Sequence, residues 1–144
     1  MSSLKKIAVI IGTRPEGIKL APVVRQLLRS TMLKPLVIST GQHREMLEQA
    51  LHPFGVRPDV NLSIMSAGQT LHDVTSKSLA GLRSVFHEHQ PAWVIVQGDT
   101  TTAFAAALAA FYDQRPVAHV EAGLRSGHRY SPFPEEIKIG RAHV

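Results

Sequence analysis

The stretch Lys6-Ile-Ala-Val-Ile-Ile11, followed directly by Gly12-Thr-Arg-Pro-Glu16, decides the fold of this chain. The first six residues form a short apolar run, rich in β-branched side chains, that ends at a glycine. This pattern predicts a strand buried on both faces. Residues 18–30 then show the apolar period of a helix. Pro22 is expected either in the first turn of that helix, which would then begin after Ile18, or at a kink.

The remainder of the chain repeats this alternation of strands and helices. Thr70 and Asp73 have the spacing of a capping box, which marks the start of a long helix. Trp93 and the alanine-rich helix after it are interpreted as core, and residues 56–69 as polar and irregular. Strands separated by helices predict right-handed crossovers, and therefore an α/β fold with a doubly wound parallel sheet. The further strands are expected at residues 35–40, 93–96 and 117–120, and the further helices at 44–51, 70–89 and 101–112.

The composition limits the classes of protein to which the chain can belong. It has 144 residues, of which 44% are hydrophobic and 19% charged, and this suits one compact globular domain. It has no cysteine, so disulfides, cysteine-ligated zinc and thiol catalysis are excluded. No signal-peptide pattern occurs at the start, and the apolar runs are far shorter than the ~20 residues that a membrane helix needs. We therefore expect a cytoplasmic protein with no membrane partner.

Neither nucleic acid nor a metal or cofactor is indicated. The formal net charge is +5, but the basic residues are scattered and form no stripe with aromatic residues, so the charge suits a small phosphate-bearing ligand equally well. The eight histidines form no convincing metal site; His87 and His89, for example, point about 200° apart around a helix. A dinucleotide cofactor lacks support because the chain has no Gly-x-Gly-x-x-Gly motif.

The residues best suited to chemistry lie where predicted strands end. A doubly wound sheet binds ligands beyond the carboxyl ends of its strands, at the point where the strand order reverses. The loops after the first, third and fourth predicted strands carry Arg14 with Lys19, then Asp99, then Glu121. Residues 12–19 fail the P-loop pattern, because lysine does not directly follow the second glycine. Arg14 and Lys19 together nevertheless favour a site that binds an anion. Either residue alone would be interpreted as a solvated surface charge.

The carboxylates have structural interpretations beside the functional ones. Asp99 is equally the N-cap of the following helix or, if Thr100 or Thr101 caps that helix, a carboxylate that faces the cleft. Function is slightly favoured for Glu121, because a carboxylate at the end of a buried strand is costly to desolvate unless it is paired or used. Glu135 follows two prolines and, by spacing alone, is typical of the start of a solvated helix.

Five stretches, in order along the chain, resemble the non-hydrolysing UDP-N-acetylglucosamine 2-epimerases. Each is weak alone, but the five together cover the chain from about Lys6 to Glu136 and make the resemblance specific. They are Gly12-Thr-Arg-Pro-Glu16 with Lys19, Gln42-His-Arg-Glu-Met-Leu47, Gln97-Gly-Asp-Thr-Thr-Thr102, His119-Val-Glu-Ala-Gly-Leu-Arg125 and Tyr130-Ser-Pro-Phe-Pro-Glu-Glu136.

The resemblance implies the Rossmann-like N-terminal half of a two-domain GT-B-type fold, with the active site between the domains and a homodimer as the assembly. It implies reversible epimerisation at C2 of UDP-N-acetylglucosamine to UDP-N-acetylmannosamine, through elimination and re-addition of UDP and without a cofactor. The reaction would serve the synthesis of bacterial surface polysaccharide.

The resemblance also implies roles for individual residues. Asp99, Glu121 and Glu135 match catalytic positions, where carboxylates would remove and return the C2 proton. Arg14 and Lys19 match positions at which cations would stabilise the departing diphosphate.

A second group of residues matches a region associated with a further, regulatory substrate molecule. Gln42 and Glu45 belong to it, and His43 between them is counted with the substrate-binding residues. His43 and His119 lie near strand ends, and each is more simply interpreted as a histidine that makes structural polar contacts than as a residue that binds a ligand.

The resemblance ends after Glu136. The family continues there with an Asn-Arg pair and a second domain, whereas this chain reads Ile137-Lys-Ile-Gly-Arg-Ala-His-Val144. Ile-Gly-Arg-Ala-His-Val is also the translation of a common sequencing-library adapter. We therefore expect residues 1–136 to be the N-terminal domain, residues 137–144 to be a non-native tail, and the C-terminal domain to be absent. The chain alone is then expected to be inactive.

Three other functions are compatible with these residues. A hydrolysing relative would release UDP and free N-acetylmannosamine. A glycosyltransferase of the same architecture would need an acceptor, and the first and fourth stretches argue against it. A non-catalytic module would bind the sugar nucleotide without turnover.

Overall fold

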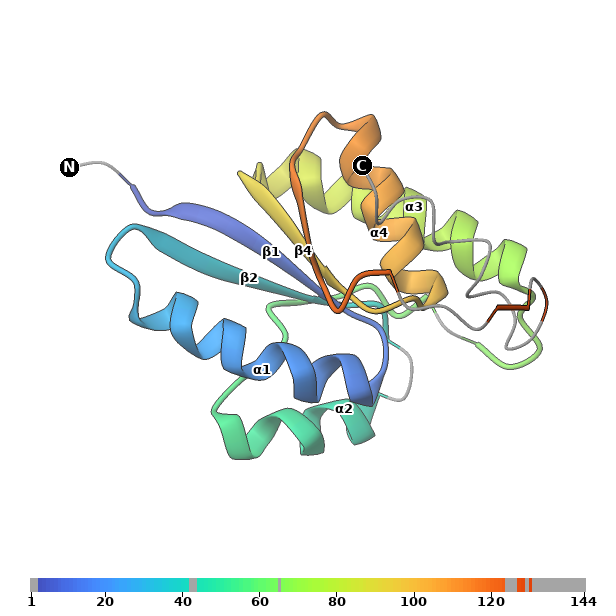
Figure 1. Cartoon of the computed structure of the whole chain (residues 1–144), viewed down its shortest axis with the longest axis horizontal. Coiled ribbons are helices and arrows are strands. Elements are labelled where there is room, and N and C mark those ends of the chain that lie inside the picture. Colours follow the sequence, from blue (N-terminus) through green and yellow to red (C-terminus); the bar gives the residue numbers. More distant parts are fainter. Residues whose placement is uncertain (1–2, 42–43, 65, 124–126, 129, 131–144) are drawn as a thin grey trace.

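The computed structural model describes residues 3–41, 44–64, 66–123, 127–128 and 130. Within them, five parallel strands form one sheet in the order β3-β2-β1-β4-β5. Figure 1 shows β1 between β2 and β4. The strands are β1 (Lys5–Ile11), β2 (Leu33–Ser39), β3 (Val60–Asn61), β4 (Trp93–Gln97) and β5 (Val117–Val120). The helices are α1 (Arg14–Arg29), α2 (Arg44–Leu51), α3 (Leu71–His89) and α4 (Thr101–Tyr112), with the 3-10 helix η1 (His52–Phe54) after α2.

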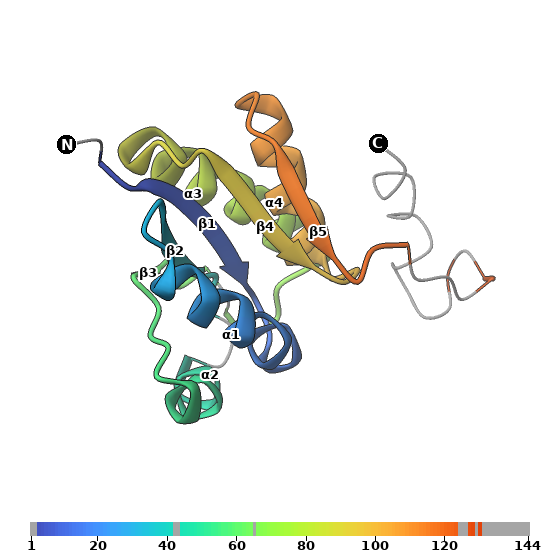
Figure 2. The ribbon, with the colours of Figure 1, turned by 60° about the vertical axis from the view of Figure 1, so that its left-hand side comes forward.

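Helices cover both faces of the sheet, so the doubly wound prediction is confirmed (Figure 2). The central strand β1 supplies alternate side chains to two separate cores, as a strand buried on both faces must. Ala8 and Ile10 belong to the core under α3 and α4, with Leu82 and Phe86. The other core lies under α1 and α2 and contains Ile7, Val9, Ile11, Leu20, Val24, Leu47 and Leu51.

Helix α1 begins at Arg14, four residues before the predicted position, and Pro22 lies in its interior rather than its first turn. The prediction that the helix begins at or after Ile18 was therefore wrong. A capping box explains the early start: the Thr13 side chain accepts from the Glu16 backbone N–H, and the Glu16 side chain accepts from the Thr13 backbone N–H. Pro15 in the first turn is also compatible with a helix start.

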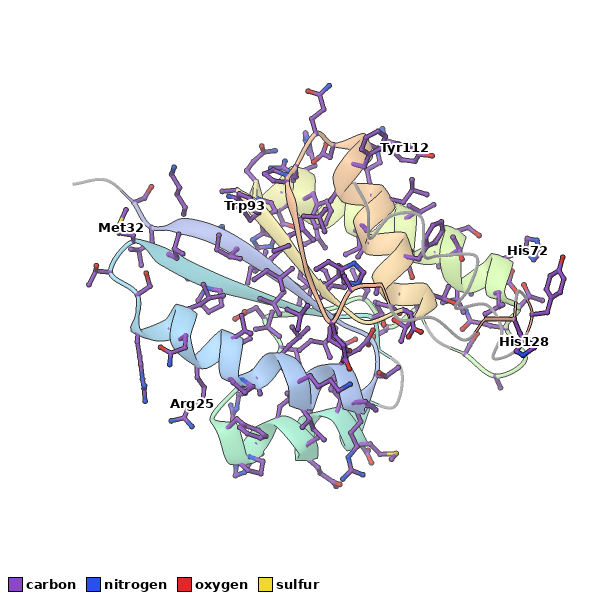
Figure 3. All side chains as sticks on the ribbon, viewed as in Figure 1. Arg25, Met32, His72, Trp93, Tyr112 and His128 are labelled. Carbon is purple, nitrogen blue, oxygen red and sulfur yellow. The ribbon has the colours of Figure 1, made fainter. Side chains whose placement is uncertain are left out.

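Other elements confirm or correct the sequence analysis in detail. The capping box of Thr70 and Asp73 starts α3, as predicted. Residues 56–69 are not irregular throughout, because β3 lies within them and pairs with β2. Trp93 is 46% exposed, so its interpretation as core was wrong. It lies with Met32 at the amino edge of the sheet (Figure 3).

The topology defines where a site can form. After β1 the chain adds β2 and β3 on one side, and then returns to place β4 and β5 on the other side of β1. The strand order therefore reverses between β1 and β4, and the loops after these two strands diverge there. These loops contain Gly12 with Thr13, and Gly98 to Thr100. Among the described residues, none of the helices has both the length and the apolar character needed to span a membrane.

Candidate active site at the carboxyl edge of the sheet

The loop after β1 packs tightly against the start of α4. A Cβ atom placed on Gly12 would lie 2.5 Å from Thr102 Oγ1 and 2.7 Å from Thr102 Cβ, closer than real contacts allow. Glycine is therefore needed at position 12 for the two segments to approach each other across the point of strand reversal.

Glu16 is the most deeply buried carboxylate among the described residues, with a side chain only 1% exposed. Its Oε2 accepts hydrogen bonds from the backbone N–H groups of Gly12 (2.7 Å) and Thr13 (2.5 Å). Its Oε1 accepts from the hydroxyl of Thr100, which follows β4. Burial raises the pKa of Glu16 above its ordinary value, although these hydrogen bonds act in the opposite direction.

Lys19 and Glu121 meet across the molecule, from the second turn of α1 and from the residue after β5. Lys19 Nζ lies 2.6 Å from Glu121 Oε2, and the Gln97 side-chain amide donates to the same oxygen. The hydrogen bond and charge of Lys19, with help from Gln97, lower the pKa of Glu121. The pair thus makes the carboxylate harder to protonate than an ordinary glutamate.

Glu121 also has a left-handed backbone, with φ of 56°. A residue other than glycine adopts this conformation only at a cost, and such residues are concentrated at functional sites. The conformation directs the chain out of β5 while the side chain stays beside Lys19. Two unusual features therefore coincide at one predicted catalytic residue.

Thr100, not Asp99, is the N-cap of α4. Its side-chain oxygen accepts from the backbone N–H of Ala103 at 3.1 Å. The sequence left two roles open for Asp99, helix cap or carboxylate facing the cleft, and the structure excludes the first. Asp99 lies between Gly98 and Thr100, in the loop at the point where the strand order reverses.

Gly98 joins this loop to β5. Its N–H donates to the Val120 carbonyl at 2.9 Å, and its own carbonyl oxygen lies 2.6 Å from His119 Nε2. Because a carbonyl oxygen can only accept, this nitrogen of His119 carries a hydrogen. His119 therefore makes a structural polar contact, as one of its two interpretations predicted.

The predicted site residues are placed as follows. Arg14, the first residue of α1, and Glu45, in the first turn of α2, are both exposed at helix starts that follow the carboxyl ends of strands. The structure brings Lys19 and Glu121 into contact. Gln42, His43 and Glu135 lie outside the described residues, and so do residues 131–144 with the proposed tail. In the described part of the chain, no group of three histidine, aspartate or glutamate side chains is arranged to hold a metal ion.

Two residues that organise the site, Glu16 and Gln97, had no role predicted from the sequence, and Thr100 was considered only as a possible helix cap. A signal was present for Glu16, because Thr13 and Glu16 have the capping-box spacing that was recognised at Thr70. The same box would also have placed the start of α1 correctly. Nothing in the spacing marks Gln97, since its partner Glu121 is 24 residues away in the sequence.

The fold is that of a Rossmann-like α/β domain, and Lys19, Asp99 and Glu121 form a strand-end cluster at the carboxyl edge of its sheet. The structural neighbours of this domain are the N-terminal parts of GT-B-type enzymes. A putative UDP-N-acetylglucosamine 2-epimerase from Listeria monocytogenes superimposes with a TM-score of 0.91 at 47% identity; the match covers 98% of this chain and 37% of that one. A UDP-GlcNAc 2-epimerase from Neisseria meningitidis, bound to UDP-GlcNAc, gives a TM-score of 0.88 at 46% identity and covers 95% of this chain and 37% of that one.

Sequence comparison identifies the family. A family profile described as UDP-N-acetylglucosamine 2-epimerase matches residues 25–139. A probable UDP-N-acetylglucosamine 2-epimerase of Ralstonia solanacearum is 51% identical over 134 residues, which are 93% of this chain and 36% of the relative. The UDP-N-acetylglucosamine 2-epimerase of Escherichia coli K12 is 50% identical over 131 residues, which are 91% of this chain and 35% of the relative. The chain belongs to the UDP-N-acetylglucosamine 2-epimerase family and spans about the N-terminal third of these relatives.

Proposed function

We propose that this chain is the N-terminal part of an isomerase that interconverts UDP-N-acetylglucosamine and UDP-N-acetylmannosamine without hydrolysis and without a cofactor. The observation that carries the proposal is the Lys19–Glu121 pair at the carboxyl edge of the sheet, in a chain whose relatives are named as 2-epimerases. We further propose that the full-length parent is a cytoplasmic homodimer that acts in the synthesis of surface polysaccharide.

The chemistry explains why both cations and carboxylates are needed. The C2 proton of the sugar has no adjacent carbonyl, so its removal alone gives no stabilised anion. In the proposed route the C1–O bond breaks and UDP leaves with the electron pair, a carboxylate takes the C2 proton, and a C1–C2 double bond forms. UDP then adds back to C1 while a proton reaches C2 from the opposite face.

The charge state of Glu121 supports a role as the group that takes the proton. Its carboxylate is charged at neutral pH, as an ordinary glutamate is, while Lys19 and Gln97 lower its pKa and so keep it a weak base before substrate arrives. We propose that Lys19 moves to the diphosphate when the substrate binds. The loss of its hydrogen bond would raise the pKa of Glu121 and make the carboxylate a stronger base.

The remaining roles follow the resemblance. Arg14, exposed at the first residue of α1, supplies a second cation near the diphosphate, where the helix N-terminus also favours negative charge. Asp99 and Glu135 complete the set of carboxylates for proton transfer. Gln42, His43 and Glu45 are proposed to contact substrate, with Gln42 and Glu45 serving a regulatory molecule.

The deciding experiment recovers the full-length parent by resequencing the locus past Glu136 and assays it with each UDP-sugar in D₂O. We expect both UDP-sugars at equilibrium, with deuterium at C2 of each. A chimera that joins residues 1–136 to the remaining part of the Bacillus subtilis relative, which is 51% identical over 132 residues, provides an independent enzyme for the same assay.

The products separate this proposal from its alternatives. Free N-acetylmannosamine together with UDP would identify a hydrolysing enzyme. Binding of UDP-N-acetylglucosamine in calorimetry, without deuterium incorporation, would identify a non-catalytic module. An Asp99→Asn variant serves as the control, because it keeps the side-chain shape and removes the carboxylate. We expect it to bind the sugar nucleotide and to lose most of the turnover.

A further inference from the structure

Glu16 stands apart from the residues that the proposed chemistry uses. Its side chain is 1% exposed and lies between the two loops that diverge at the point of strand reversal. A carboxylate is seldom buried to this extent unless its oxygens are satisfied. Both of its oxygens are occupied by groups of the chain itself, so it is not presented to a ligand.

Its three hydrogen bonds connect separate parts of the chain. Oε2 accepts hydrogen bonds from two backbone N–H groups of the loop after β1. Oε1 accepts from the hydroxyl of Thr100 in the loop after β4, 84 residues further along the chain. Thr100 in turn caps α4 through Ala103. One side chain therefore links the start of α1 to the start of α4.

The linked segments carry two of the proposed active-site residues. Arg14 is the first residue of the helix that Glu16 caps, and Asp99 directly precedes Thr100. We propose that Glu16 is a positioning residue, which holds the loop of Arg14 at a fixed separation from the loop of Asp99 without touching the substrate. This inference rests on the proposed function, for which these two residues must face the same substrate.

The hydrogen-bond pattern shows which property of Glu16 matters. A glutamine at this position places its carbonyl oxygen at the site of Oε2, where it accepts both backbone N–H groups. Its amide nitrogen then faces Thr100 Oγ1, and a hydroxyl oxygen is able to accept as well as donate. Burial already raises the pKa of Glu16, which shows that the surroundings disfavour its charge. The shape and hydrogen bonds of the side chain are thus sufficient for positioning, and its negative charge is not required.

The test compares Glu16→Ala, Glu16→Gln, Thr100→Val and Thr100→Ser in the full-length parent, with kcat expressed per folded enzyme. Glu16→Ala and Thr100→Val break the link, and we expect each to lower kcat about 10²-fold, the loss that a displacement of about 1 Å produces. KM should change by a smaller factor, because a displaced Asp99 affects the reaction more than binding. Glu16→Gln and Thr100→Ser keep the link and should restore kcat to within about threefold of wild type.

Two further measurements separate positioning from a general structural role. The double variant Glu16→Ala with Thr100→Val should lose clearly less kcat than the product of the two single losses, because the two side chains share one hydrogen bond. Asp73→Ala removes a capping box of the same kind at the start of α3, where Asp73 contacts Thr70 and no residue of the two loops. It should leave kcat per folded enzyme unchanged.

The inference is overturned by any of three outcomes. If Glu16→Gln loses as much kcat as Glu16→Ala, the charge of the carboxylate is required and its shape and hydrogen bonds do not suffice. If the pH profile of Glu16→Gln loses a limb that wild type shows, the carboxylate itself titrates in the reaction. If Glu16→Ala keeps wild-type kcat per folded enzyme, its role is in folding alone. Failure of the proposed function is recognised separately, because the wild-type parent would then not interconvert the two UDP-sugars. In that case the Glu16–Thr100 link is tested by denaturant unfolding of the same single and double variants. Shifts in the unfolding midpoint that are not additive support the link, and additive shifts overturn it.

Discussion

At the scale of single residues, Lys19 and Glu121 provide the most direct test of the site. The Lys19 hydrogen bond is the largest cause of the lowered pKa of Glu121. We expect Lys19→Ala to raise that pKa toward the ordinary glutamate range, and Lys19→Arg to keep it low because the positive charge remains. Titration of the Glu121 carboxyl carbon by NMR measures the shift. An unchanged pKa in the alanine variant would show that Gln97 alone controls the carboxylate.

Glu16 gives a pH dependence of the opposite sign. Burial raises its pKa, so the folded chain binds this proton more tightly than the unfolded chain does. The stability that this group contributes is therefore fully present below the ordinary glutamate pKa and is lost as pH rises through the raised pKa. Glutamine does not titrate, so Glu16→Gln should gain free energy of unfolding relative to wild type as pH rises through that window.

Urea unfolding of both chains across acidic and neutral pH measures this difference. The other carboxyl groups titrate in both proteins and largely cancel in the comparison. A difference that does not vary with pH would mean that Glu16 keeps an ordinary pKa in the folded chain.

The contact between Gly12 and Thr102 predicts a packing effect. Gly12→Ala places a Cβ atom 2.5 Å from Thr102 Oγ1, so the loop or the helix must move, and we expect a loss of about 1–3 kcal/mol in the free energy of unfolding. Denaturant unfolding checks the value. In a Thr102→Gly background the same substitution should cost clearly less; an equal cost in both backgrounds would place the strain elsewhere.

The sequence predicted the location of some site residues better than their contacts. Asp99 and Glu121 were expected at strand ends, because strand-end position depends on a local apolar pattern that is readable in the sequence. The Gln97–Glu121 and Glu16–Thr100 hydrogen bonds were not expected, because they join residues 24 and 84 positions apart. Such contacts depend on the three-dimensional arrangement of loops, which no local pattern contains.

At the scale of elements, the start of α1 was mispredicted because Pro22 was considered and the capping box of Thr13 and Glu16 was not. Pro22 is an exposed interior residue of α1 and donates no backbone hydrogen bond there. Pro22→Ala restores a donor and should stabilise the chain by about 2 kcal/mol, after allowance for the freer unfolded chain. Pro15→Ala is the matched control: Pro15 lies in the first turn, where its lack of an N–H costs nothing, so its replacement should change stability by less than about 1 kcal/mol.

The melting temperatures of both variants test this assignment of the helix. A destabilised Pro22→Ala chain would mean that the proline ring makes packing contacts that outweigh the lost hydrogen bond.

The short strand β3 marks the limit of element prediction. Val60 and Asn61 show no alternation that distinguishes them from a loop, and they become a strand only because Ile38 and Ser39 of β2 offer a free edge. Asp59 helps to fix this register, since its side chain accepts from the Val37 N–H at 2.7 Å. Tertiary pairing of this kind overrides local propensity.

At the scale of the whole molecule, the alternation of buried strands with amphipathic helices was sufficient to predict a doubly wound parallel sheet, although not its short strand β3. The handedness of βαβ crossovers then leaves few arrangements, and the observed order reverses beside β1 as a doubly wound sheet requires. The candidate site is less complete. Lys19 and Glu121 remain exposed on one edge of the domain, and a charged pair in contact with water is weak and cannot exclude water from a reaction.

This exposure leads to a prediction about the chain by itself. Proton transfer at C2 needs an enclosed, preorganised site, whereas this chain covers about 35% of the length of relatives named as epimerases. We expect purified 1–144 not to interconvert the two UDP-sugars, and the full-length parent or the chimera to do so under the same conditions. Deuterium incorporation at C2 is the measurement, because it detects even rare turnover. Incorporation by the chain alone, abolished by Asp99→Asn, would show that the strand-end cluster is sufficient and that no second wall of the site is required.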